Sequence, residues 1–229
     1  VVPILNGASI ECLDEADVSA LARAIDAERV SYVAASFAIH RELLARFAGR
    51  PRPPGGRLRV AVVNAGRLEA GEVVALEAAL GVPVVTAFGA TEIGTALCQR
   101  LPPASRVPGA AGTPMGTEVR LVDDADAEVR AGAFGELLVR GPMVFDGYLD
   151  DDALTAEVLR DGWYRTGDMA RVDAAGEFHI AGRRGEMINR GGEKIAPLDV
   201  DAALRAVPGI VDAAAFGVPH PSLGEEVVA

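Results

Sequence analysis

Two short apolar runs, Leu58-Arg-Val-Ala-Val-Val63 and Val82-Pro-Val-Val-Thr-Ala87, stand on either side of residues 69–80 and decide the fold of this chain. Each run is short and nearly continuously apolar, which is typical of a strand that is buried on both faces of a sheet. We predict that Glu69–Leu80, between the two runs, forms a helix. A strand, a helix and a strand in this order predict a parallel sheet that is covered by helices.

The residues before these runs extend the same alternation of helices and strands. An amphipathic helix is predicted to begin at Asp14, because acidic residues favour a helix start and apolar side chains then recur at helical spacing. A strand is expected over residues 31–35, a second helix through Phe47, and a loop over the Pro- and Gly-rich residues 51–56. Residues 1–100 are therefore predicted to be an α/β part with a parallel sheet.

The pattern then changes. Short β-like runs, separated by turns rich in Gly, Pro and Asp, predict a small antiparallel β subdomain over residues 101–184. These runs are Glu118–Val122, Gly135–Arg140, Tyr164–Val172 and Glu177–Ile180. Pro197–Ala206 has the pattern of a helix, and Ile210–Val218 that of an extended segment. We predict a large α/β domain over residues 1–184 and the start of a small α+β C-terminal domain over residues 185–229.

Composition narrows the class of protein. Half of the 229 residues are hydrophobic, which is enough for one substantial core. No apolar run approaches the roughly 20 residues that cross a bilayer, so we expect no membrane span and a cytoplasmic location. The net charge of −11 argues against binding to nucleic acid. Cys12 and Cys98 are far apart in sequence and are expected to be reduced thiols.

The motif Phe88-Gly-Ala-Thr-Glu92 follows a predicted buried strand, which in a parallel sheet places it at the carboxyl end, where ligands collect. A carboxylate such as that of Glu92 is a hard oxygen ligand that suits Mg²⁺, and Gly89 permits a close approach of the backbone. The alternative is structural: Phe88 belongs to the core, Thr91 is the N-cap of a helix, and Glu92 lies in its first turn.

A second motif, Tyr164-Arg-Thr-Gly-Asp168, places a carboxylate at the end of a predicted strand. Such a carboxylate can accept hydrogen bonds from both hydroxyls of a ribose, and Gly167 allows the backbone to turn tightly before it. The alternative is an ordinary surface turn. Gly191 and Gly192 also allow a structural and a functional interpretation. The structural one is a glycine turn between two short strands.

Five motifs stand in one order along the chain: Phe88–Glu92, Gly135–Gly141, Gly147-Tyr148, Tyr164–Asp168 and Gly182-Arg183. Their order and spacing resemble those of the adenylate-forming, or AMP-binding, superfamily of enzymes, in particular acyl-CoA synthetases of the coumarate–CoA ligase type. The resemblance implies an AMP-forming acid–thiol ligase. Such an enzyme joins ATP and a carboxylic acid into acyl-AMP, releases pyrophosphate and then forms a thioester with coenzyme A, as in fatty acid metabolism.

The resemblance assigns the catalytic roles to the first motif. The hydroxyl of Thr91 meets the α-phosphate, and Glu92 holds Mg²⁺. Phe88 lies against adenine, and Gly89 belongs to the same nucleotide-binding element. These residues are therefore expected to bind ATP before the reaction and AMP after it.

The second half of the chain supplies the ribose contacts that the resemblance implies. Asp168 binds the ribose hydroxyls, and Arg183 assists it. Lys194, the only lysine of the chain, lies outside the position of the family's adenylating lysine and is expected to be structural or to face solvent.

Two further elements complete the implied binding site. Asn64, Ala65 and Gly66 resemble an element whose backbone approaches adenine. Gly191 and Gly192 resemble the loop that lines the channel for the pantetheine arm of coenzyme A.

Two parts of the family pattern are absent from the 229 residues. One is the upstream loop, ending in Pro-Lys-Gly, that embraces the β- and γ-phosphates, and the other is the downstream remainder of the lid domain with its lysine. We therefore expect an internal fragment that cannot complete adenylation without the missing N- and C-terminal parts of the parent chain. Two alternatives stay open: an adenylation domain that loads a carrier protein, and a noncatalytic nucleotide-binding or interaction fragment.

Overall fold

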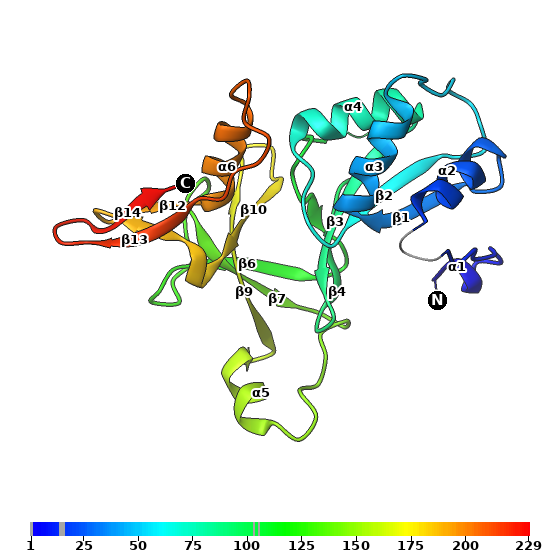
Figure 1. The fold of residues 1–229 in the computed structure, drawn as a ribbon. Helices are drawn as coiled ribbons and strands as arrows, with labels where there is room; N and C mark the ends of the chain where they lie inside the picture. The colour runs from blue at the N-terminus through cyan, green and yellow to red at the C-terminus, as the bar shows by residue number, and fades with distance from the viewer. Residues whose placement is uncertain (1, 14–16, 103, 105) are drawn as a thin grey trace. The chain divides into compact units, whose positions relative to one another are not determined.

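The structure is a computed structural model that describes every residue of the chain except 1, 14–16, 103 and 105 (Figure 1). It has two compact units, Val1–Val84 and Val85–Ala229. Helices occur together with parallel and antiparallel strands, which confirms the predicted α/β class. The predicted domain division between residues 184 and 185 stays a prediction. No helix in the described part of the chain is both long enough and apolar enough to span a bilayer.

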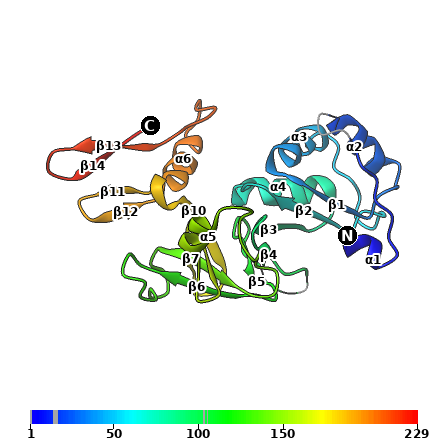
Figure 2. The same ribbon diagram turned by 90° about the horizontal axis from the view of Figure 1, so that it is seen from below.

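The first unit contains a parallel pair of strands with helices beside it. β1 (Tyr32–Ser36) pairs in parallel with β2 (Val60–Asn64), so that Ser36 lies opposite Asn64 where both strands end. The helices are α1 (Val2–Leu5), α2 (Val18–Asp26), α3 (Phe37–Phe47) and α4 (Ala70–Leu80). Figure 2 shows α2, α3 and α4 beside the two strands. The predicted alternation of strands and helices, with parallel pairing, is confirmed.

Local capping explains where the helices of the first unit begin and end. The Asp17 side chain accepts a backbone N–H from the first turn of α2 at 2.7 Å. The predicted helix start at Asp14 lies outside the described residues. Glu69 and Glu72 form a reciprocal capping box at the start of α4, and Gly81 ends that helix in the left-handed conformation with a φ of +69°. These caps fix α4 against the buried core, whose members include Leu43, Phe47, Val63, Leu76 and Leu80.

The second unit is built mainly from antiparallel strands. β3 (Val84–Ala90), which begins at the last residue of the first unit, pairs with β4 (Gly94–Cys98), and β4 pairs with β5 (Thr113–Pro114). A further sheet has the order β10-β9-β7-β6, with β8 (Leu159–Arg160) on β9. Its strands are β6 (Glu118–Val122), β7 (Gly135–Arg140), β9 (Trp163–Val172) and β10 (Phe178–Arg183). This sheet confirms the antiparallel pattern that the sequence predicts.

The last part of the chain forms a four-stranded sheet and two short connecting elements. The strand order is β12-β11-β14-β13, with β11 (Ile188–Arg190), β12 (Glu193–Ile195), β13 (Phe216–His220) and β14 (Gly224–Val228). The two connecting elements are η1 (Arg184–Glu186) and α6 (Pro197–Arg205), whereas α5 (Asp152–Val158) lies earlier in the chain, between β7 and β8. The predicted extended segment over residues 210–218 is a strand only from Phe216 onward. Before it, the Asp201 side chain accepts the Ala215 N–H at 2.6 Å, in place of a partner strand.

Candidate functional site

The motif Phe88–Glu92 forms part of a β-hairpin. Thr91 and Glu92 lie in the turn between β3 and β4, so the alternative that Thr91 caps a helix is wrong. The two residues directly follow the end of β3, but the strand next to them, β4, is antiparallel. The chain can turn here because Gly89 has no side chain: a Cβ atom there would lie 1.9 Å from the carbonyl oxygen of Gly94. The turn is therefore fixed by a close approach of two backbone segments.

A tyrosine, and not a cation, holds the carboxylate of Glu92. The hydroxyl of Tyr148 donates to Oε1 of Glu92 at 2.9 Å, and the backbone N–H of Phe145 donates to the Glu92 carbonyl oxygen at 2.8 Å. Among the described residues, no arginine, lysine or histidine forms an ion pair with Glu92, and no protein group donates to its Oε2. Glu92 therefore keeps one carboxylate oxygen and its charge for a ligand.

An aromatic cluster surrounds this hydrogen bond. The ring of Phe145 packs edge-on against Tyr148, with centroids 4.9 Å apart, and against Tyr164, with centroids 5.6 Å apart. Burial raises the pKa of the Tyr164 hydroxyl, and its hydrogen bond with Tyr148 and the charge of Glu92 raise it further. The guanidinium of Arg183 acts on the same pKa in the opposite direction. The pKa of Tyr164 is therefore influenced by the charges of both Glu92 and Arg183.

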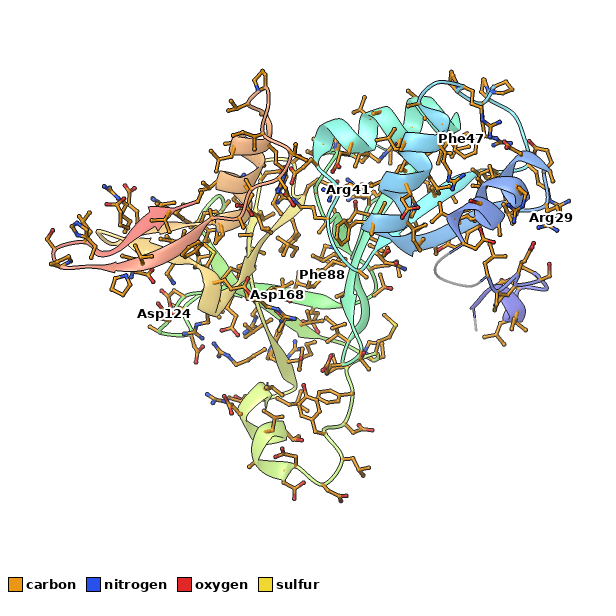
Figure 3. The ribbon with its side chains drawn as sticks, viewed as in Figure 1. Arg29, Arg41, Phe47, Phe88, Asp124 and Asp168 are labelled. Carbon is orange, nitrogen blue, oxygen red and sulfur yellow. The ribbon has the colours of Figure 1, made fainter. Side chains whose placement is uncertain are left out.

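The predicted ribose-binding pair, Asp168 and Arg183, is brought together on the adjacent strands β9 and β10; Asp168 is labelled in Figure 3. Nε of Arg183 is 3.4 Å from Oδ1 of Asp168, and Nη1 donates to the carbonyl oxygen of Thr166 at 2.9 Å. The Asp168 N–H donates to Oγ1 of Thr166 at 3.0 Å, and Gly167 adopts a φ of +71° between them. Thr166 thus accepts hydrogen bonds from both members of the pair, the Asp168 backbone and the Arg183 guanidinium, contacts that were not predicted.

The environment of Asp168 raises the pKa of its carboxyl. Burial is the main cause, and the charge of Glu186 adds to it, while the guanidinium of Arg183 lowers the pKa. The Asp168 side chain is 15% exposed, whereas that of Arg183 is 62% exposed. A carboxylate with one guanidinium on one side keeps free lone pairs, so it can accept hydrogen bonds from two hydroxyls.

Gly191 and Gly192 occupy the turn between β11 and β12, with φ values of +61° and +91°. The Gly191 N–H donates to the carbonyl oxygen of Leu223 at 2.7 Å, and both glycines are exposed. The predicted glycine turn between two short strands is confirmed. The predicted contact with coenzyme A stays a prediction.

The first unit contains the predicted adenine-binding element. Asn64 is the last residue of β2, and Ala65 and Gly66 follow it directly. Ala65 has a φ of +52° and Gly66 a φ of +117°, and a Cβ atom at Gly66 would lie 2.3 Å from the ring of Phe37. Asn64, Ala65 and Ser36 line part of a hollow of about 680 Å³ in this unit. The strained backbone is compatible with a contact made by main-chain atoms.

The donor set around Glu92 fits a cation that arrives with a nucleotide. In the residues that the structure describes, no group of three or more His, Cys, Asp or Glu side chains could hold a metal ion. Mg²⁺ is usually bound by one or two carboxylates, with substrate phosphates and water as the other ligands. The free Oε2 of Glu92 matches this pattern. The described residues around it do not offer the several ligands that a permanently bound metal ion needs.

Signals for the missed contacts were weak. Phe145, Tyr148 and Thr166 all contact site residues. Tyr148 and Thr166 lie in the motifs Gly147-Tyr148 and Tyr164–Asp168 but had no assigned role, and Phe145 lies in no motif. Tyr148 is 56 positions from Glu92, so only the fold shows that they meet.

Comparisons with known proteins find a family, related sequences and related structures. The family described as AMP-binding enzyme matches residues 1–149. An oxalate–CoA ligase of Arabidopsis thaliana is 35% identical over 191 residues, which are 82% of this chain and 37% of the relative. The chain spans about a third of the length of the curated relatives that it matches.

Solved structures resemble nearly the whole chain. ATP-bound MatB from Rhodopseudomonas palustris has a TM-score of 0.87 at 28% identity, and the match covers 99% of this chain and 45% of that one. The anthranilate–CoA ligase AuaEII, in complex with anthranoyl-AMP, has a TM-score of 0.82 at 27% identity, with 96% and 43% covered. Both similarities extend well beyond the part of the chain that the family match covers.

Proposed function

The chain belongs to the AMP-binding enzyme family, and we propose that it is part of an ATP-dependent carboxylate–CoA ligase. In the first step, an oxygen of the carboxylic acid attacks the α-phosphorus of ATP, so that pyrophosphate leaves and acyl-AMP forms. In the second step, the thiol of coenzyme A attacks the acyl carbonyl carbon, AMP leaves and a thioester forms. The observation that carries the proposal is the Asp168–Arg183 pair in a unit that also holds Glu92 without a counter-charge.

Asp168 and Arg183 are proposed to hold the ribose. The carboxylate accepts hydrogen bonds from the two ribose hydroxyls. Its contact with Arg183, and the hydrogen bond from the Asp168 backbone N–H to Thr166, fix its position before the nucleotide arrives. Arg183 also offsets the charge of Asp168, which reduces repulsion of the nearby phosphates. Phe88, half-buried at the edge of an apolar cluster, offers a ring face to adenine.

Thr91 and Glu92 are proposed to act on the phosphates. The turn presents the Thr91 hydroxyl to the α-phosphate and Oε2 of Glu92 to the Mg²⁺ that accompanies ATP. When bound, Mg²⁺ supplies positive charge that stabilises the oxygens between the α-phosphate and the departing pyrophosphate. Lys194 forms an ion pair with Asp124 at 3.2 Å, which supports a structural role for the only lysine of the chain.

The remaining predicted contacts belong to the same proposal. Asn64, Ala65 and Gly66 contact adenine through their backbone, and the exposed Gly191 and Gly192 line the path of coenzyme A. The other parts of the parent protein complete the site. The proposal also places the parent enzyme in the cytoplasm and in the metabolism of fatty acids or related carboxylic acids.

The test uses the complete protein that carries residues 1–229. It is incubated with ATP, Mg²⁺, coenzyme A and a panel of aliphatic, aromatic and dicarboxylic acids, and pyrophosphate and thioester are measured. At least one acid is expected to give both products, and Asp168→Ala is expected to abolish them. Transfer to a phosphopantetheinyl carrier protein, but not to coenzyme A, would favour a carrier-loading domain. Nucleotide binding without pyrophosphate release from any acid would indicate a noncatalytic binding protein.

A further inference from the structure

The hydrogen bond between Tyr148 and Glu92 has an unusual partner for a carboxylate in a nucleotide site. Buried or half-buried carboxylates are commonly paired with arginine or lysine, as Glu136 and Asp168 are in this unit, while the buried Asp201 accepts a backbone N–H. Glu92 instead accepts a hydrogen bond from a neutral hydroxyl at 2.9 Å. A neutral donor fixes the direction of the carboxylate and leaves its charge uncompensated.

The backbone around Tyr148 is arranged to deliver this hydroxyl. The Tyr148 N–H donates to Oγ1 of Thr155 at 2.9 Å, and that hydroxyl donates to the carbonyl oxygen of Asp151 at 2.8 Å. Gly147, with a φ of +150°, makes room for the turn, because a Cβ atom there would lie 2.7 Å from the methyl group of Thr155. The aromatic ring then rests against Phe145, whose N–H also holds the Glu92 carbonyl oxygen.

Tyr164 adds a second tyrosine ring to the surroundings of this hydrogen bond. Its ring packs edge-on against Phe145, with centroids 5.6 Å apart, and Phe145 packs in the same way against Tyr148. The three aromatic rings therefore limit the movement of the Tyr148 ring, which holds its hydroxyl on Oε1 of Glu92.

We propose that Tyr148 is a positioning residue for Glu92: it occupies Oε1 and presents Oε2 as the single carboxylate oxygen for the cation that a nucleoside triphosphate brings. The proposal rests on the proposed function, because it takes Glu92 as the residue that meets this cation. It assigns Tyr148 no contact with the substrate. Loss of the Tyr148 hydroxyl is therefore expected to weaken the effect of Mg²⁺ on nucleotide binding and to spare binding that needs no Mg²⁺.

The test measures, by calorimetry on the complete protein, the affinity for AMP in EDTA and the affinity for a nonhydrolysable ATP analogue with and without Mg²⁺. The ratio of the two ATP-analogue affinities is the Mg²⁺ effect. In Tyr148→Phe, which keeps the ring against Phe145, this ratio is expected to fall about tenfold, while AMP affinity changes less than about twofold. Ser9→Ala, which removes an exposed hydroxyl of the first unit, is the control and is expected to change neither.

A double-mutant cycle separates positioning from a general structural effect. In a Glu92→Gln background, adding Tyr148→Phe is expected to leave the Mg²⁺ effect unchanged, because the carboxylate that Tyr148 serves is gone. An equal loss with and without Glu92, or an unchanged Mg²⁺ effect in Tyr148→Phe, overturns the inference. If Tyr148→Phe lowers AMP affinity as much as it lowers the Mg²⁺ effect, the role is structural and the inference is also overturned. A wild-type protein that binds no nucleotide at all contradicts the proposed function itself.

Discussion

Two carboxylates of the second unit, Glu92 and Asp168, are held in opposite ways. Glu92 lies in a hairpin turn, accepts a hydrogen bond from the neutral Tyr148 hydroxyl at 2.9 Å and has no cationic partner among the described residues. Asp168 lies on β9 and faces the guanidinium of Arg183 at 3.4 Å. The negative charge of Glu92 has no counter-charge beside it, whereas the negative charge of Asp168 is partly offset by an arginine.

This difference indicates different ligands. A carboxylate without a counter-charge attracts a cation, whereas one beside an arginine mainly offers hydrogen-bond acceptors to neutral hydroxyls. The charges of Glu92 and Arg183 act on the pKa of one residue, Tyr164, and they act in opposite directions. The variants below act on one part at a time.

The largest expected effect comes from a variant that breaks the Glu92 turn. In Gly89→Ala, the new methyl group would lie 1.9 Å from the carbonyl oxygen of Gly94. The clash can be relieved only if the backbone of the hairpin moves, which costs free energy. The free energy of unfolding is expected to fall by about 3 kcal/mol, measured by denaturant unfolding. Gly185→Ala is the matched control, because a methyl group there meets no atom within 4 Å. Equal stability of the two variants would show that the turn is built differently.

A second variant removes the charge of Glu92 and keeps its shape. Glu92→Gln can still accept the hydrogen bond from Tyr148, so the fold is expected to be unchanged. The gain in ATP-analogue affinity from Mg²⁺ is expected to shrink about tenfold, because an amide is a poor ligand for this cation. Glu157→Gln, on the exposed face of α5, serves as the control in the same calorimetric titration. A Mg²⁺ effect as large as that of the wild type in Glu92→Gln would end the assignment of Glu92.

A third prediction uses pH to separate the two carboxylates. Ribose hydroxyls donate to ionised Asp168, so AMP affinity is expected to fall as pH decreases through the raised pKa of this carboxyl. The same raised pKa means that the folded state binds a proton more tightly than the unfolded state, so this contribution to stability is present at low pH and is lost as pH rises. Asp168→Asn is expected to flatten the pH dependence of AMP affinity in the range above 3.8, the ordinary pKa of an aspartate, and to be no less stable than wild type at neutral pH. A pH profile unchanged by this variant would place the titrating group elsewhere.

The smallest effect is expected at Asp124, a carboxylate that belongs neither to the Glu92 part nor to the Asp168–Arg183 part of the site. Asp124 pairs with Arg184 at 2.8 Å and with Lys194 at 3.2 Å, and its side chain is 66% exposed (Figure 3). Exposed ion pairs contribute little, so Asp124→Asn is expected to change AMP affinity by less than about twofold. A large loss in the same titration would mean that these ion pairs, and not Thr166, position the ribose-binding pair.

The sequence alone predicted those parts of the fold that depend on local pattern. Apolar runs and capping residues predicted the helices and strands of the first unit, such as α4 between Glu69 and Gly81, because burial and capping act over a few neighbouring residues. The extended segment over residues 210–218 was predicted too long, because the Asp201 side chain satisfies the Ala215 N–H from another element. Such a contact has no local signal.

The candidate site shows the same division. The pairing of Asp168 with Arg183 could be expected from motif order, and the strands place the two residues opposite each other. The alternative that Thr91 begins a helix failed because the close approach of Gly89 and Gly94 forms a hairpin. The contact of Tyr148 with Glu92 depends on how β3, β4 and the segment before α5 fold together, so it appears only in three dimensions.

Calorimetric titration of AMP into the complete protein, with wild type and Asp168→Ala side by side, tests the central claim most directly. Two charged hydrogen bonds to the ribose would be lost in the variant, so AMP affinity is expected to fall at least about thirtyfold. Asp152→Ala, at an exposed carboxylate of α5, is expected to bind AMP as wild type does. Equal AMP affinity in Asp168→Ala and wild type would contradict the account.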